Sequence, residues 1–490
     1  MTAMAPVTPL WINGEQCHLE EGSYEVRNPL TGDIVGHASA ANRQHCMQAI
    51  DAAGRAFRSW EDTHPRDRAE VLVKASGILG TTTYLDRVKE IIPAETGISE
   101  MEITMQTVAT VRYLKDVASM LADLKGDSFP SVLPGGLVMS QRRALGVVLV
   151  VAPWNAPIMM TVRAMAVALL CGNTVVVKAS DLSPRSQEIV VECFHEAGIP
   201  KGVLNFLSIS PSDAPGLIAE MIAHPLIRKI SFVGSEKVGR IIASEAGKHL
   251  KTCVLELGGK APAVILDDAD IKKAARAVAS SAMITSGQNC MATARAIVQQ
   301  GVAEEFISEL QKHFANTRAG DVAGSPRAHL ATLINENAAE NAIQIVKEAQ
   351  NSGARVLVGD MQRVNGVLQP HLVIGAKPGM RIWGAECFAP VLAVAVVARV
   401  EDAIELANTS DYSLVASLWT DNINRAVEVS HRIRAGYVEV NGPTMHTEPF
   451  WSNGGYGGSS GFGHFHVEDF MTTHVTVFHS GGPKYYPVVG

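Results

Sequence analysis

One cysteine of the chain stands among small and polar residues instead of in an apolar run. Cys290 lies in the segment SGQNCMATAR, residues 286–295. A nucleophilic cysteine needs access to its substrate and surroundings that favour the thiolate, and a small, polar segment provides the access. Cys290 is therefore a candidate nucleophile, although an ordinary buried or loop thiol fits the same context.

A carboxylate and an amide follow two predicted strands. Glu256 ends an apolar run and precedes Gly258 and Gly259, which allow the backbone to turn tightly. A carboxylate at such a place can act as a general base, or it can be a solvated turn residue. Asn155 follows Trp154 in VVAPWNAP. Its amide can donate hydrogen bonds to an oxyanion, or it can satisfy its own turn.

Two further segments contain residue types that bind nucleotides. In VVVKASDLSP, Lys178 and Asp181 can donate to and accept from ribose hydroxyls, or can belong to a capped surface turn. In FVGSEKVG, the small residues Gly234, Ser235 and Gly239 would let a pyrophosphate approach a helix N-terminus. The second segment is not G-x-G-x-x-G, so by itself it is a weak dinucleotide signal.

The elements predicted around these residues alternate between strand and helix. Continuous apolar runs predict buried strands at 147–152, 174–178, 203–207 and 229–233. Helical patterns lie between them, including one capped by Ser183 and Pro184. A second series begins at Thr252, contains a helix over 270–285 and ends with a strand at 436–440. The alternation predicts an α/β fold with parallel, doubly wound sheets, preceded by helices over 43–122.

The segment 126–143 differs in composition and pattern from the segments around it. It combines prolines, a Gly-Gly turn and a short alternating stretch, which predicts a β-ribbon outside the core. The tail from His464 reads as irregular, with an edge strand at 474–478. Its histidines and carboxylates fit no zinc or two-metal spacing, so we expect no metal site.

The composition narrows the classes of protein. The 490 residues are 47% hydrophobic and 19% charged, which excludes a disordered chain. A net charge of -7 without a basic block argues against nucleic acid as the main partner. Seven cysteines without C-x-x-C spacing indicate reduced thiols. We expect a cytoplasmic protein, because no signal peptide is evident and the apolar runs are too short to span a membrane.

The joint order of the motifs is more specific than any one of them. PWN, K-A-S-D, G-S-x-x-x-G, E-L-G-G-K and G-Q-x-C follow one another, with ECFAPV at 386–391 and NGPT at 441–444. In this order the chain resembles the NAD(P)-dependent aldehyde dehydrogenase superfamily, from about Trp11 to Phe470. It is similar to the subgroup that acts on salicylaldehyde, benzaldehyde and vanillin.

The resemblance implies a fold of two doubly wound domains and a small β-ribbon oligomerisation element. The NAD-binding domain would comprise residues 1–125 and 144–255, and the catalytic domain residues 256–463. Residues 126–143 and 464–490 would form the oligomerisation element of a homodimer or homotetramer. The implied partners are a small-molecule aldehyde and no nucleic acid or membrane.

The resemblance also implies a mechanism. Cys290 would form a thiohemiacetal, Asn155 and the Cys290 N–H an oxyanion hole, and Glu256 would activate the water that hydrolyses the thioester. Because Asp181 would repel a 2′-phosphate, we expect NAD and not NADP. The residues implied to bind the cofactor are Trp154, Lys178, Ser180, Asp181, Gly234, Ser235, Gly239, Glu386 and Phe388.

The implied substrate pocket points to an aromatic aldehyde. Ala156 leaves room for a flat ring, and Arg163 can meet a phenolic or carboxylate oxygen or lie on the helix surface. The other residues that the resemblance implies in the substrate pocket are Met159, Asn289, Phe450, Trp451 and Phe462.

The chain departs from the family pattern at two places, Ala389 and the loop PFWSNGGYGGSSG. These departures bear on specificity more than on the reaction. The alternatives are a CoA-acylating or aliphatic semialdehyde dehydrogenase, and a catalytically silent nucleotide-binding or structural relative.

Overall fold

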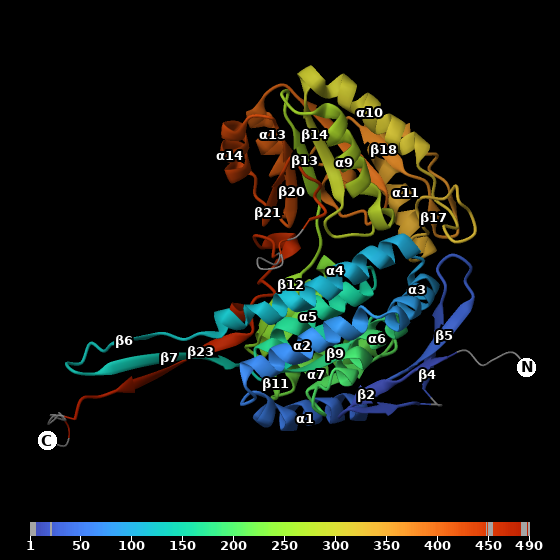
Figure 1. Ribbon diagram of the computed structural model, residues 1–490. Coiled ribbons are helices and arrows are strands. Elements are labelled where there is room, and N and C mark those ends of the chain that lie inside the picture. The colour runs from blue at the N-terminus through green and yellow to red at the C-terminus, as the bar shows by residue number, and fades with distance from the viewer. Residues whose placement is uncertain (1–5, 20–21, 447, 449–453, 482–487, 489–490) are drawn as a thin grey trace, which may run out of the picture.

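Two large sheets and a projecting ribbon organise the chain. The computed structural model describes residues 6–19, 22–446, 448, 454–481 and 488. Each large sheet forms the centre of one lobe, and the ribbon extends from the first lobe as an arm (Figure 1). The α/β fold predicted from the alternation of strands and helices is confirmed, although antiparallel strands lie at both edges of the first sheet and at one edge of the second.

The first lobe is built on an eight-stranded sheet whose five central strands are parallel. Antiparallel strands complete both edges. In spatial order the strands are β22 (Gly461–Phe462), β12 (Thr252–Glu256), β11 (Ile227–Val233), β8 (Val147–Val151), β9 (Thr174–Lys178), β10 (Leu204–Leu207), β2 (Leu10–Ile12) and β3 (Glu15–Cys17).

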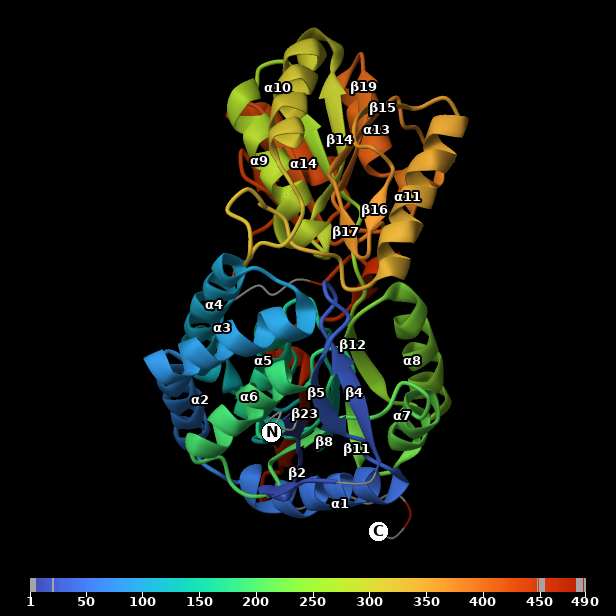
Figure 2. The same ribbon diagram turned by 90° about the vertical axis from the view of Figure 1, so that its right-hand side faces the viewer.

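Helices cover both faces of this sheet because its central strands are apolar on both sides. In β8, Val148 and Val150 face one core, and Val147, Leu149 and Val151 face the other. Figure 2 shows the two helical layers on either side of the sheet. The first layer contains α2 (Pro65–Leu79), α3 (Thr82–Thr96), α4 (Glu100–Ser119), α5 (Pro157–Leu170) and α6 (Pro184–Glu196), and the second contains α1 (Arg43–Trp60), α7 (Ala214–Ala223) and α8 (Glu236–Lys248).

The second lobe is built on a seven-stranded sheet in which six strands are parallel. Its order is β15 (Arg355–Val358), β18 (His371–Ile374), β19 (Val391–Val397), β14 (Thr293–Gln299), β13 (Ala261–Ile265), β20 (Val415–Trp419) and β21 (Tyr437–Val440). One face packs on α9 (Ile271–Met283) and α10 (Ala303–Asn316). The other packs on α11 (Glu336–Asn351), α12 (Arg381–Gly384), α13 (Val400–Ala407) and α14 (Ile423–Arg432).

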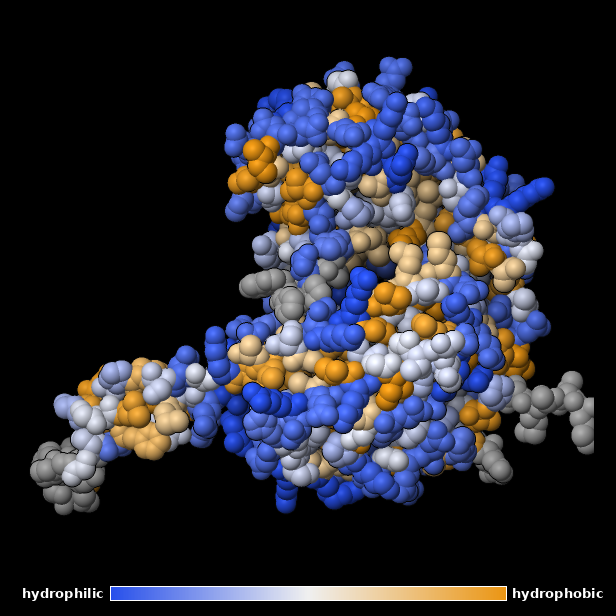
Figure 3. Space-filling view, in the orientation of Figure 1, coloured by the Kyte–Doolittle hydropathy of each residue, from blue (hydrophilic) through white to orange (hydrophobic). Residues whose placement is uncertain are grey.

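The arm is a three-stranded ribbon of β6 (Ser128–Pro130), β7 (Leu137–Ala144) and β23 (Met471–Phe478). The β-ribbon predicted at 126–143 is confirmed. The tail strand is longer than expected and begins at Met471, because it pairs with β7 along its whole length. Apolar side chains gather on the arm (Figure 3), among them Phe129, Val132, Leu133, Leu137, Val475, Val477 and Phe478.

Smaller elements complete the described part of the chain. A three-stranded sheet contains β1 (Val7–Thr8), β5 (Ile34–Ser39) and β4 (Ser23–Arg27), and β16 (Arg363–Val364) pairs with β17 (Val367–Leu368). Within the residues that the structure describes, no helix has the length and apolar character needed to cross a membrane.

Two predicted helix ends differ in detail from the expectation. Ser183 occupies the N-cap position of α6, but its side chain makes no capping hydrogen bond. The carboxylate of Glu95 on α3 takes that role and accepts from the N–H groups of Arg185 and Ser186, at 3.1 and 2.8 Å. The helix predicted over 270–285 ends at Met283, because Thr285 and Ser286 adopt left-handed backbone conformations.

Glu95→Ala should therefore destabilise the first lobe. The change leaves two N–H groups at the start of a buried helix without their acceptor, which costs roughly 2 kcal/mol. Calorimetry should show a melting temperature several degrees lower. Glu90→Ala, an exposed position on the same helix, is the matched control. An equal melting temperature for the two variants would contradict the capping role.

Candidate active site

The parallel register of the first sheet brings the sequence motifs to one edge. Val151 of β8 pairs with Lys178 of β9, and Val233 of β11 pairs with Glu256 of β12, so these strands end level with one another. The chain also changes direction at β8, since β9 and β10 lie on one side and β11 and β12 on the other. Ligands of open α/β sheets bind at the carboxyl edge at such a switch point. Asn155 lies beside it.

Cys290 reaches this edge from the other lobe. It lies between the short 3-10 turn η2 (Ile284–Gly287) and β14, and it is half-buried. Its Sγ donates a hydrogen bond to Oε1 of Glu256 at 2.7 Å. The two residues come from different sheets, so the contact spans the boundary between the lobes.

The charges around Cys290 favour the protonated thiol. Burial, followed by the carboxylates of Glu256 and Glu386, raises the pKa of this thiol well above its ordinary value, and Arg163 opposes them. Burial also raises the pKa of Glu386 to about 7, although the N–H of Gly259 donates to it at 3.0 Å. At neutral pH Cys290 is therefore a thiol whose proton points at Glu256.

Asn155 lies beside the loop that carries Cys290, residues 284–292, which we call the nucleophile loop. A hydrogen bond to this loop holds the Asn155 side chain. Its buried Nδ2 donates to the backbone oxygen of Gln288 at 3.0 Å. The Gln288 side chain is itself fixed, because its Oε1 accepts from the Ile334 N–H at 2.8 Å. A side-chain amide has two N–H groups, so this arrangement orients a second donor without using it.

Two cavities meet at this point. One has a volume of about 480 Å³ and the other of about 250 Å³, and both are lined by Cys290, Asn155 and Met160. The surface is hollowed between the two lobes (Figure 3). Cys290 therefore borders both cavities, so that one ligand in each cavity could approach it.

The larger of these cavities, which we call the α4–α5 cavity, contains most of the residues predicted for the substrate pocket. Its wall combines apolar side chains with charged ones, most of which come from α4. Its lining includes Glu102, Gln106, Arg112, Tyr113, Asp116, Ala156, Met159, Arg163, Ile284, Asn289, Met291 and Met445.

The smaller cavity suits the nicotinamide end of a dinucleotide. The rings of Trp154 and Phe388 meet edge to face at 6.0 Å in its wall. Gly234 and Ser235 line it at the start of α8, where N–H groups favour an anion. A side chain at Gly258 would bring a Cβ within 2.7 Å of the Glu386 carboxylate, so glycine keeps this wall open.

The other predicted cofactor residues lie along the same edge but outside this cavity. Lys178 is buried at the end of β9, where desolvation lowers the pKa of its ammonium against the attraction of Asp181. The N–H of Ser180 donates to Gln187 Oε1 at 2.6 Å. Gly239 lies within α8, where a Cβ would come within 2.1 Å of a Leu257 methyl, so its role here is close packing.

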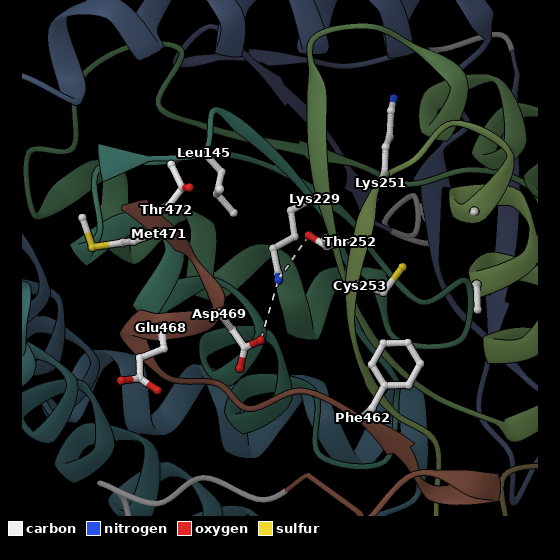
Figure 4. Close-up of a pocket in the computed structure, with 12 residues that line it drawn as sticks. Leu145, Lys229, Lys251, Thr252, Cys253, Phe462, Glu468, Asp469, Met471 and Thr472 are labelled. Carbon is white, nitrogen blue, oxygen red and sulfur yellow. Dashed lines mark hydrogen bonds and ion pairs between the residues drawn. The ribbon is translucent and has the colours of Figure 1, made fainter. Parts of the chain in front are cut away.

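The predicted pocket aromatics have a different outcome. Phe450 and Trp451 lie outside the described residues. Phe462 was expected in the substrate pocket, and that prediction is wrong. It belongs to β22, which pairs with β12, and this pairing turns its side chain into a cavity at the foot of the arm (Figure 4).

That cavity has a volume of about 670 Å³, and its lining contains neither Cys290 nor Glu256 nor Asn155. In Figure 4 Lys229 lies between Thr252 and Asp469, with Nζ 3.5 Å from the hydroxyl and 3.8 Å from the carboxylate. Burial raises the pKa of its one thiol, Cys253, to about 11. Lys229 is thus paired, and the thiol is protonated. The second lysine of the lining, Lys251, donates to the backbone oxygens of Ile222 and His224.

Comparison with known proteins identifies the family. Residues 15–478 match the sequence profile of the Aldehyde dehydrogenase family. The chain belongs to this family. It is 38% identical to a vanillin dehydrogenase of Pseudomonas sp. (strain HR199 / DSM 7063), over 98% of this chain and 99% of the relative. It is 33% identical to a benzaldehyde dehydrogenase [NAD(+)] of Pseudomonas putida, over 91% and 90%.

The fold agrees with this assignment. A crystal structure of a salicylaldehyde dehydrogenase from Pseudomonas putida G7, complexed with salicylaldehyde, superposes with a TM-score of 0.94. The two chains are 31% identical, and the match covers 98% of this chain and 99% of the other. As a member of the aldehyde dehydrogenase family, the protein is an oxidoreductase that acts on small aldehydes with a nicotinamide cofactor, NAD or NADP.

Several residues of the site are not predicted from the sequence, among them Gln288, Tyr113 and Glu102. Gln288, whose backbone oxygen accepts from Asn155, lies inside the G-Q-x-C motif. Its place in that motif could have indicated a role in the site. Tyr113 and Glu102 lie on α4, in a stretch where the sequence shows helical periodicity and nothing else. The carboxylate of Glu102 accepts a hydrogen bond from the N–H of Thr285 in the nucleophile loop. These two residues are far apart in sequence, so a local motif does not reveal the contact.

Glu256→Gln should make Cys290 more reactive toward iodoacetamide. The substitution removes the nearest negative charge, so the pKa of the thiol falls and more thiolate is present at a given pH. We expect the alkylation rate of the Cys290 peptide at pH 8, followed by mass spectrometry, to rise about tenfold.

Glu386→Gln is the matched comparison for this experiment. Glu386 acts on the thiol only through its charge, so its removal should accelerate alkylation less. If Glu256→Gln left the rate unchanged or lowered it, the electrostatic description of the thiol would be wrong.

Proposed function

We propose that the protein oxidises an aromatic aldehyde to the carboxylic acid with NAD. The observation that carries this proposal is the position of Cys290 and Asn155 in the walls of both cavities. One cavity has the size and apolar lining for an aromatic ring, and the other has the small residues and helix N-terminus for a nicotinamide nucleotide. The named substrates of similar relatives, vanillin and benzaldehyde, support an aromatic substrate.

In the first step Cys290 attacks the aldehyde carbon. Oε1 of Glu256, 2.7 Å from Sγ, takes the thiol proton as the S–C bond forms. The carbonyl oxygen becomes an oxyanion, and the second N–H of Asn155 together with the backbone N–H of Cys290 donates to it. The product is a thiohemiacetal on Cys290.

The second half of the reaction releases the acid. Glu386 and Phe388 would hold a nicotinamide in the smaller cavity, and this group would supply the acceptor for the hydride that the thiohemiacetal loses. Loss of that hydride leaves a thioester on Cys290. Once its first proton has passed to solvent, Glu256 takes a proton from the attacking water, the S–C bond breaks, and the carboxylate leaves. Aldehyde, water and NAD thus become carboxylate, NADH and two protons.

Asp181 supports NAD as the cofactor. It follows Lys178 at the end of β9, the strand next to β8 at the switch point. A carboxylate there accepts from a free 2′-hydroxyl and repels a 2′-phosphate. Lys178, Ser180 and Asp181 would then bind the adenosine half of the dinucleotide.

We further propose that the protein works as a homo-oligomer through its arm. Val132 is 99% exposed, and the arm carries further exposed apolar side chains on β7 and β23. A contiguous apolar surface of this kind marks an interaction site. The proposed units are the NAD-binding domain at 1–125 and 144–255, the catalytic domain at 256–463, and the oligomerisation element at 126–143 and 464–490, with β22 adding an edge strand to the first sheet.

A spectrophotometric assay of NADH formation tests the proposed reaction. Wild-type enzyme should oxidise benzaldehyde, vanillin and salicylaldehyde faster than aliphatic aldehydes, with NAD preferred to NADP. Cys290→Ala should be inactive because no thiohemiacetal can form. Glu256→Gln should give a burst of NADH followed by slow turnover, because the thiol, whose pKa is lowered by the loss of the carboxylate, can lose its proton to solvent, whereas the base for hydrolysis is gone.

Three outcomes would contradict the proposal. Equal activity of wild type and Cys290→Ala would exclude the nucleophile. A clear preference for aliphatic aldehydes would exclude the substrate class. Unchanged steady-state turnover of Glu256→Gln would exclude the hydrolytic base.

A further inference from the structure

The α4–α5 cavity is lined by polar residues that the reaction at Cys290 does not use. Tyr113 is only 3% exposed, and its hydroxyl has no hydrogen-bond partner among the residues that the structure describes. The same holds for Oε1 of Gln106. Both residues line the cavity. Buried polar groups in proteins are almost always hydrogen-bonded, so two such atoms in one cavity point to a ligand.

The helix places these two groups on one face. Gln106 and Tyr113 are both on α4, seven positions or about two turns apart, so their side chains project in the same direction. Opposite them α5 contributes Met159 and Arg163, which are four positions apart and line the same cavity. The ring of a flat ligand between the two helices could contact Met159, while a polar substituent of that ring could contact Tyr113 and Gln106.

Charge near Tyr113 favours an oxygen atom of the ligand. The guanidinium of Arg163 lies over the Tyr113 ring, 5.8 Å from its centroid. Burial raises the pKa of the Tyr113 hydroxyl to about 12, with Arg163 opposing, so the hydroxyl keeps its proton and is a donor at neutral pH. A donor beside a buried cation fits an electron-rich oxygen, and the Gln106 carbonyl fits a hydroxyl hydrogen.

We propose that Tyr113 and Gln106 form a subsite for a hydroxyl group on the aromatic ring of the substrate. The Tyr113 O–H donates to the oxygen of that group, and Gln106 Oε1 accepts its hydrogen. The positive charge of Arg163 favours the partial negative charge on the oxygen of that hydroxyl group. The preferred substrates are accordingly hydroxybenzaldehydes, and this preference rests on the oxidation of aromatic aldehydes proposed above.

Equilibrium binding separates this subsite from the chemistry. Titration calorimetry of Cys290→Ala, which cannot react, should show 3- or 4-hydroxybenzaldehyde binding about tenfold more tightly than benzaldehyde. When Tyr113→Phe is added, the ratio of the two affinities should fall about tenfold, so that both aldehydes bind with nearly equal affinity. Gln106→Leu should also lower this ratio. 4-Methoxybenzaldehyde, which accepts but cannot donate, should lose affinity with Tyr113→Phe and not with Gln106→Leu.

The same ratio can be followed in turnover. In the reactive enzyme, Tyr113→Phe should lower kcat/KM for the hydroxybenzaldehyde relative to benzaldehyde by about tenfold, mainly through KM. Tyr84→Phe is the matched control, since it removes a buried hydroxyl that is on α3 and does not line the cavity. It should leave the ratio as in wild type.

The results also distinguish the two proposals. Equal affinity of the Cys290→Ala protein for benzaldehyde and both hydroxybenzaldehydes would overturn the subsite, even if the enzyme oxidises all three. A loss of affinity in Tyr113→Phe that is the same for every aldehyde would also overturn it, because the role would then be structural. If the hydroxyl preference appears in binding but no aldehyde is turned over, the subsite stands and the proposed reaction fails.

Discussion

The hydrogen bond between Cys290 and Glu256 is the contact on which the site depends. Glu256 ends a strand of the first sheet, whereas Cys290 precedes a strand of the second, and their side-chain atoms lie 2.7 Å apart. Neither lobe has both groups. The relative position of the lobes therefore decides whether a thiol and its proton acceptor meet, and whether the two cavities share a wall.

The loop that holds Cys290 is fixed from several directions. Thr285 and Ser286 adopt left-handed conformations, which residues with a Cβ rarely adopt and which cost about 1 kcal/mol each. Glu102 accepts from the Thr285 N–H, and the Ser286 hydroxyl donates to the Ala331 carbonyl. Gly287 packs so closely on Ala389 that a Cβ would come within 2.3 Å of its backbone. These contacts define a single position for the nucleophile.

The sequence predicts the parts of the site that lie in local motifs. Buried strands such as β8 and β9 are recognisable because both faces are apolar, and Glu256 and Asn155 follow such strands directly. The cap of α6 and the left-handed turn after α9 were missed for one reason. Each depends on a carboxylate from a distant helix, Glu95 or Glu102, and periodicity within a helix says nothing about its contacts with remote segments.

The pocket shows the same limit. The family resemblance implies Arg163 and Met159 in the pocket, but Tyr113 and Gln106 belong to α4, whose sequence has no motif to distinguish them. Phe462 was misplaced because an aromatic residue in a glycine-rich segment gives no information on which cavity it will face. β-Pairing with β12 decides that orientation.

A covalent intermediate on Cys290 distinguishes the proposed reaction from any direct oxidation of the aldehyde. Glu256→Gln enzyme should be mixed with benzaldehyde and NAD, quenched in acid, digested and analysed by mass spectrometry. A benzoyl group on the peptide that contains Cys290, absent without NAD, is the result predicted here. Rapid NADH formation with no acyl group on that peptide, or with the group on another cysteine, would contradict it.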